Sequence, residues 1–229
     1  MQLNTQVVTQ AGSFPSVQSK VMRDTYIMLA LTMIPTIIGA IIGTSMSFTF
    51  LATNPIMGSL LMFGAMIGML FAVSALRNSA WGIAALLGFT LVAGVFLGPI
   101  LQVALHLNNG VQLIGMAAGG TGIIFFSLAT IATVTKKDFS FMGKFLFIGL
   151  ILLIVASLAN LFFQIPALSL TLSAIAILIF SAYILYDVSR IVNGGETNYV
   201  MATMGLYLSV YNLFINLLHL LMAFGGERD

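Results

Sequence analysis

The chain has 229 residues, of which 60% are hydrophobic and 6% are charged, and its mean hydropathy is +1.11. Such a small number of charged side chains cannot cover a domain of this size in water. The composition therefore excludes an ordinary soluble protein and indicates a protein of the lipid bilayer. The net charge of +2 argues against a nucleic-acid partner, and the absence of cysteine excludes disulfides and thiolate metal sites.

Seven apolar segments are each long enough to cross the bilayer, which takes about 20 mostly apolar residues. We predict spans over residues 26–46, 56–76, 80–102, 112–135, 141–163, 167–191 and 199–224. Residues 1–23 are expected to be a flexible cytoplasmic tail, and residues 24–229 a single transmembrane domain, because the joints are too short for a second one. The sequence therefore predicts an all-α membrane protein, a seven-transmembrane-helix bundle.

Basic residues mark every second joint between the predicted spans. Cytoplasmic joints carry an excess of lysine and arginine, so this alternation predicts a cytoplasmic N-terminus and a C-terminus on the opposite, periplasmic side. A re-entrant sixth or seventh segment is the alternative, and it would place both termini in the cytoplasm. The basic residues are Lys20, Arg23, Arg77, Lys136, Lys137, Lys144 and Arg190.

Each of the first four predicted spans contains the pattern GxxxG, and the last three do not. Small residues four apart let helix backbones approach closely in lipid, so the pattern predicts a tightly packed subdomain of spans one to four. Chance is the alternative explanation, because the chain has 22 glycines. Pro99 is expected to bend or weaken the third span. The pairs are Gly39 and Gly43, Gly64 and Gly68, Gly94 and Gly98, and Gly115 and Gly119.

Polar side chains in spans five to seven fall on one face of each helix, at about 100° per residue. Three polar faces would be costly against lipid, so we expect them to face one another. They either line a hydrated cavity or simply form hydrogen bonds between helices. The candidate lining residues are Asn160, Ser173, Tyr183, Asn212, Asn216 and His219.

Asp187 lies twenty residues into the sixth span, about 30 Å along the helix, which places it at the cytoplasmic edge of the hydrocarbon layer. It either pairs with Arg190 at the interface or closes the polar cavity as a gate or cation ligand. A lone carboxylate is a poor calcium site, so no resident metal is predicted. The sequence contains no HExxH, GxSxG, P-loop or dinucleotide motif, so we predict neither an enzyme nor a cofactor.

Four stretches carry a resemblance to a known family: "FLGPIL" at 96–101, "KKDFSF" at 136–141, "YILYD" at 183–187 and "LYLSVYNLFINLL" at 206–218. They resemble the Bax inhibitor-1 (TMBIM) family of integral membrane proteins, over about residues 24–226. The stretch "GGETNY" at 194–199 looks most like the bacterial YccA-like branch. The resemblance implies a seven-helix bundle in which the last helix is central.

Some bacterial members of this family are pH-sensitive calcium leaks, in which two aspartates near the inner ends of spans six and seven are latched by an arginine. Asp187 matches the first aspartate, and Arg77 is the matching arginine at the end of span two. The second aspartate is replaced by Ser209, so the pair is broken. Arg190 is the other candidate for the latch, because it lies one helical turn from Asp187.

Members of the YccA-like branch look like partners of FtsH, a membrane-anchored ATP-dependent protease. The resemblance implies that they bind this protease and restrain it. We therefore predict a protein of the bacterial inner membrane that modulates FtsH in membrane protein quality control. Its N-terminal tail is a segment that such a protease could grip. A leak for Ca²⁺ or H⁺ is the alternative function, and a structural membrane scaffold is a third.

Overall fold

The computed structural model describes residues 14–226, and within that range the chain is helical and contains no strand. Seven helical segments there are long and apolar enough to cross a membrane, which confirms the predicted all-α seven-helix bundle. The elements are α1 (Phe14–Ser45), α2 (Thr49–Thr53), α3 (Pro55–Leu76), α4 (Ala80–Phe96), α5 (Gly98–Leu105), α6 (Gly110–Thr135), η1 (Ser140–Met142), α7 (Gly143–Phe163), α8 (Pro166–Val192) and α9 (Tyr199–Gly225).

Local sequence signals set the helix boundaries. The helices α3 and α8 begin with Pro55 and Pro166, a residue that suits the first helical position because the missing N–H has no partner there. The carboxamide oxygen of Asn198 caps α9 by accepting hydrogen bonds from the next turn, including one from the Val200 N–H at 3.0 Å. The joints between spans therefore lie close to where turn-forming residues predict them.

The third span is divided into α4 and α5 at Leu97. The Leu97 N–H still donates to the carbonyl oxygens of Ala93 and Gly94. Pro99, two residues later, has no N–H and so cannot continue the series of helical hydrogen bonds. The predicted effect of Pro99 on this span is confirmed. In α5 the carboxamide of Gln102 donates to the carbonyl oxygens of Gly43 and Met46, at 3.0 and 2.8 Å. It thereby caps the C-terminal end of α1, whose carbonyls have no helical partner.

A close crossing of α1 and α4 organises one side of the bundle. A Cβ on Gly39 would overlap the Leu91 carbonyl oxygen, and one on Gly94 would overlap the Thr36 carbonyl oxygen. Gly43 and Gly98 continue the contact, because a Cβ on Gly98 would lie 2.7 Å from the Gly43 carbonyl carbon. Only residues without a side chain allow this approach.

The predicted subdomain of spans one to four is wrong for the fourth span, and in the second span the GxxxG pair is not what makes the contact, although α3 packs on α4. Gly64 and Gly68 of α3, and Gly115 and Gly119 of α6, have no atom within 4 Å of where a Cβ would stand, apart from their own helix and chain neighbours. The helix α6 packs mainly on α8 and α9, and its contacts with the first three spans are smaller ones, with α5 and with Tyr26 of α1. A GxxxG pattern shows that a close approach is possible, but the opposing surface decides whether one forms.

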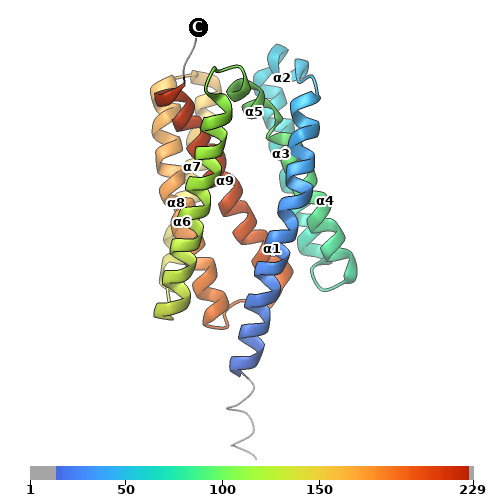
Figure 1. Cartoon of the computed structure of the whole chain (residues 1–229), viewed down its shortest axis with the longest axis vertical. Helices are drawn as coiled ribbons and strands as arrows, with labels where there is room; N and C mark the ends of the chain where they lie inside the picture. The colour runs from blue at the N-terminus through green and yellow to red at the C-terminus, as the bar shows by residue number, and fades with distance from the viewer. Residues whose placement is uncertain (1–13, 227–229) are drawn as a thin grey trace, which may run out of the picture.

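The last helix lies inside the bundle, and Figure 1 shows α9 between α1 on one side and α6 and α8 on the other. Its main contacts are with α8, α6 and α1, and it also contacts α4 and α5. Tyr207 of α9 is almost fully buried, and its hydroxyl lies 2.9 Å from the hydroxyl of Thr36 in α1. The helices α3 and α7 pack mainly on α4 and α8, respectively, and touch each other only weakly.

Part of the predicted flexible tail is helical. The helix α1 begins at Phe14, inside the predicted tail of residues 1–23, and residues 1–13 lie outside the described part of the chain. The first turns of α1 project beyond the ends of the neighbouring helices (Figure 1). The polar residues at the start of this helix extend an apolar span rather than precede it.

The basic joints meet at one end of the bundle, which we call the cationic end. The Asn198 carboxamide donates to the Arg77 carbonyl oxygen at 3.1 Å, so the joint after α8 contacts the joint after α3. The Ser189 hydroxyl accepts from the Phe139 N–H and donates to the Lys137 carbonyl oxygen, both at 2.9 Å, so the end of α8 holds the joint after α6. These bonds connect joints that are remote in sequence.

Candidate functional site

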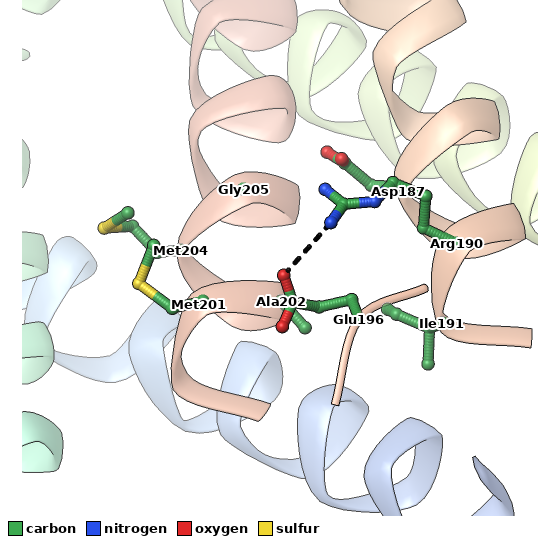
Figure 2. A pocket seen from close by; sticks show the side chains of 8 residues that line it. All are labelled: Asp187, Arg190, Ile191, Glu196, Met201, Ala202, Met204 and Gly205. Atoms are coloured by element: carbon green, nitrogen blue, oxygen red, sulfur yellow. Dashed lines mark ion pairs between the residues drawn. The ribbon is translucent and has the colours of Figure 1, made fainter. Parts of the chain in front are cut away.

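A small pocket opens at the cationic end between α8 and α9, and we call it the Asp187 pocket (Figure 2). It has a volume of about 190 Å³. The lining residues are Asp187, Arg190 and Ile191 of α8, Glu196 of the following joint, and Met201, Ala202, Met204 and Gly205 of α9.

Gly205 makes room for the Asp187 carboxylate. A Cβ at Gly205 would lie 3.2 Å from one carboxylate oxygen of Asp187 and 3.8 Å from the other. Within residues 14–226, Asp187 forms no side-chain hydrogen bond and no ion pair within 4.0 Å. The carboxylate is therefore available to a proton, water or a cation that enters this pocket.

Arg190 is held by the joint after α8. Its guanidinium donates to the Gly195 carbonyl oxygen at 3.1 Å and pairs with the Glu196 carboxylate at 3.5 Å. It also lies 5.6 Å from the centre of the Tyr186 ring, within the range of a cation–π contact. The hypothesis of a direct Asp187–Arg190 pair is wrong, because the nearer carboxylate comes from a turn that folds back over the helix end.

The other two residues predicted for the latch do not reach Asp187. Ser209 is buried, and its hydroxyl donates to the Gly205 carbonyl oxygen of its own helix at 3.2 Å. Arg77 is exposed at the end of α3 and is not part of the pocket lining. The structure therefore brings together Asp187 and Arg190 of the predicted set, and adds Glu196 and Gly205.

Sequence reasoning missed Glu196 because its position depends on a turn. Gly194 has a φ of +76°, a conformation that glycine adopts easily, and this turn brings the following residues back toward Arg190. The signal available in the sequence was the pair Gly194 and Gly195 directly after a helix end. That signal predicts a reversal of the chain, but not which side chain it places over the pocket.

A second and larger cavity lies between α3, α7, α8 and α9, toward the end opposite the basic joints, and we call it the Asn212 cavity. Its volume is about 410 Å³. Six of its lining side chains are polar on the predicted faces of α7, α8 and α9, so the three polar stripes do converge. They are Ser157, Asn160, Ser169, Ser173, Asn212 and Asn216.

Two predicted lining residues lie elsewhere. His219 is not part of the lining, but its Nδ1 lies 2.8 Å from the Ser173 hydroxyl and so supports one wall of the cavity. Tyr183 lies one turn below the cavity, next to Phe180 at a ring-centre distance of 6.3 Å. His219 therefore forms a hydrogen bond between helices, as one alternative predicted. The other four predicted residues line the cavity: Asn160, Ser173, Asn212 and Asn216.

Asp138 is a titratable group outside the spans whose pKa is shifted by its surroundings. The carboxylate of Asp138, in the joint after α6, accepts a hydrogen bond from the Ser140 N–H at 2.8 Å. Its hydrogen bonds with Ser140 hold the pKa of Asp138 below its usual value. Asp138 is exposed and does not line either cavity, so this interaction stabilises the joint rather than a binding site.

Together these features define a class: a helical membrane protein with seven spans, a carboxylate pocket at its cationic end and an uncharged polar cavity on the opposite side. A family model described as "Inhibitor of apoptosis-promoting Bax1" matches residues 18–226. The chain therefore belongs to the Bax inhibitor-1 family, as its sequence motifs suggested.

Similar proteins are found in several bacteria. The Escherichia coli K12 protein "Modulator of FtsH protease YccA" is 41% identical over 202 residues, covering 88% of this chain and 89% of the relative. An uncharacterized protein of Pseudomonas aeruginosa is 40% identical over 226 residues, covering 99% of this chain and 97% of the relative. An uncharacterized Neisseria meningitidis protein is 35% identical, with coverages of 92% and 93%. The similarity to all three thus extends over nearly the whole chain.

Proposed function

We propose that this chain is an inner-membrane protein that binds an FtsH-type membrane protease and restrains its action on other membrane proteins. The observation that carries the proposal is the 41% identity, over most of both chains, to the relative named a modulator of FtsH protease. A related E. coli protein is named an inner membrane protein, which supports the same location here.

The arrangement of charge supports a cytoplasmic position for the cationic end. Lysine and arginine are enriched in cytoplasmic joints, and the joints that carry them here lie on one side of the bundle. The first turns of α1 project from that side (Figure 1), so a protease with its catalytic domain in the cytoplasm would meet this segment first. The C-terminus would then lie in the periplasm, and cysteine-accessibility labelling of the two termini tests this orientation.

Copurification with the protease is the primary test of function. The tagged full-length chain should retain the FtsH-type protease of the same organism in mild detergent, and its overproduction should slow the turnover of a second membrane substrate. A seven-span protein of similar size from another family, carrying the same tag, is the control. If the protease does not copurify and substrate turnover is unchanged by deletion and by overproduction, the proposal fails.

The N-terminal segment can be tested separately. A variant lacking residues 1–13 should be degraded more slowly by the protease if this end is where the enzyme engages the chain. A variant lacking residues 227–229 is the matched control at the other terminus. Equal degradation rates for the two truncated chains would refute a role for the N-terminus.

A cation leak is the second candidate, and one observation favours it. Glu196 lines the same pocket as Asp187, so a second carboxylate is present although Ser209 replaces the aspartate expected in α9. Purified protein in liposomes should then admit calcium in a pH-dependent way, and Asp187→Asn should abolish the flux. Flux no higher than in empty liposomes, at both mildly acidic and mildly alkaline pH, would exclude this function.

A further inference from the structure

The Asn212 cavity has the composition of a ligand site rather than of a packing defect. Its volume of about 410 Å³ falls in the range of small-molecule pockets, which combine a mostly apolar wall with a few polar groups. Nine of its sixteen lining residues are apolar, the other seven are polar and uncharged, and none is charged. A charged ligand would find no counter-ion in this lining, so the site favours an uncharged molecule.

The polar groups of the cavity retain unused hydrogen-bonding capacity. The carboxamide nitrogens of Asn212 and Asn216 donate to backbone carbonyls one turn back, at 2.9 and 2.8 Å, which leaves their oxygens as acceptors. Asn160 shows the opposite arrangement, because its oxygen accepts from the Ile165 N–H at 3.1 Å and its NH₂ group remains a donor. Within residues 14–226, these remaining atoms have no protein partner.

On α7 and α8 the polar lining side chains lie toward one end of the cavity, which gives these two walls a gradient. On α7, Asn160 and Ser157 lie nearer the helix end at Phe163 than Leu153 and Leu150 do. On α8, Ser169 and Ser173 lie nearer the same end of the bundle than Phe180 does. Leu153 and Phe180 belong to one buried apolar cluster. A molecule with a polar end and a hydrocarbon end matches this gradient.

The opening of the cavity lies within the membrane-spanning part of the chain. Phe63 of α3 is 38% exposed and Ser157 of α7 is also exposed, and the two helices touch only weakly. Ser157 is six residues before the end of α7, which corresponds to about 9 Å along the helix. The opening therefore faces lipid more than water, and the bilayer is the source from which a ligand enters.

We propose that the Asn212 cavity binds an uncharged, hydroxyl-bearing amphiphile from the bilayer. Its hydroxyl groups bond to Ser157, Ser169 and the asparagines, and its hydrocarbon part lies against Leu150, Leu153 and Phe180. This site is independent of the proposed action on a protease, because binding needs only this chain and a membrane.

Photolabelling in vesicles tests the site. The purified full-length chain is placed in phosphatidylethanolamine and phosphatidylglycerol vesicles with a 1-monoacylglycerol that carries a diazirine in its chain, and labelled peptides are identified by mass spectrometry. Labelling should concentrate on α7 and α8 between residues 150 and 180. Excess unlabelled monoacylglycerol should reduce it, whereas an alkyl sulfate with the same chain length should not.

Variants separate the cavity from the general lipid-facing surface. Ser169→Leu should lower labelling at the site roughly threefold or more, the effect of losing one hydrogen bond in a membrane protein together with space in the cavity. Ser157→Phe should do the same by narrowing the exposed opening, where no buried packing is disturbed. Ser181→Leu, on α8 outside the lining, is the matched control and should leave labelling unchanged.

Three outcomes would overturn the proposal. One is uniform labelling of all lipid-facing helices, and another is equal competition by the alkyl sulfate. The third is unchanged labelling in both Ser169→Leu and Ser157→Phe, provided that their thermal unfolding matches that of the wild type. Each of these results would mean that the cavity does not select an uncharged, hydroxyl-bearing amphiphile.

Discussion

Replacing Gly94 by alanine should force α1 and α4 apart and destabilise the bundle. A Cβ at this position would overlap the Thr36 carbonyl oxygen and would lie 2.9 Å from the Thr36 carbonyl carbon and 3.0 Å from the Ala40 nitrogen. All of these are backbone atoms, so no side chain can rotate away to relieve the clash. Overpacking of this kind costs about 1–3 kcal/mol. A shift of α1 would also disturb the Thr36 hydroxyl, which lies 2.9 Å from the Tyr207 hydroxyl.

Thermal unfolding of the purified full-length protein in detergent measures this cost. For a chain of this size a loss of about 2 kcal/mol lowers Tm by roughly 4–8 °C. Gly64→Ala is the matched control, because it belongs to an equivalent GxxxG pair and its Cβ would meet nothing within 4 Å. Its Tm should stay close to that of the wild type. Equal Tm values for the two variants would show that the close crossing of α1 and α4 does not contribute to stability as we infer.

Three further substitutions test other contacts. Gln102→Leu removes the side-chain cap on α1 and should cost about 1–3 kcal/mol, measured as a lower Tm, whereas Gln102→Glu, which lacks the donors, should not restore it. Ser189→Ala leaves the Phe139 N–H without its partner and should cost about 1–3 kcal/mol, and Ser189→Thr, which keeps the hydroxyl, should lose less. Asp138→Asn should change the acid sensitivity of unfolding, because folding lowers the pKa of Asp138. The ionised carboxylate therefore stabilises the fold at pH values above its ordinary pKa of 3.8. This stabilisation is lost as the pH falls through the lower pKa of the folded protein. The wild type should therefore lose stability relative to the variant in that acid range, and parallel Tm curves would contradict this assignment.

The spans and joints could be predicted because they depend on local properties of the chain. Apolar length determines which segments cross a bilayer, and Pro55, Pro166 and Asn198 mark helix starts through their own backbone chemistry. The polar faces of α7, α8 and α9 were predictable for a related reason, since helical spacing places them and the cost of burying polar groups in lipid makes them converge.

The sequence could not predict which helices and side chains contact one another, because these contacts depend on surfaces that are remote in sequence. The glycine pairs of α1 and α3 follow the same pattern, yet Gly39 lies against α4 while Gly64 faces open space. In the same way, Arg190 pairs with Glu196 rather than with Asp187, because the turn at Gly194 brings the later residue back across the helix end. Either carboxylate was close enough in sequence to be the partner, and only the folded turn distinguishes them.

The sequence by itself determined that this is a membrane protein. It also determined how many helices are long enough to cross the bilayer and which faces of those helices are polar. It also carried the motifs of its family. The tertiary structure decided which glycines form a close helix crossing, and it placed Asp187 against Gly205 with no side-chain partner among residues 14–226. It also decided that the polar stripes enclose a cavity with apolar walls. The physical reason is that composition and periodicity act within one helix, whereas close approach, ion pairing and cavity shape require two surfaces to meet.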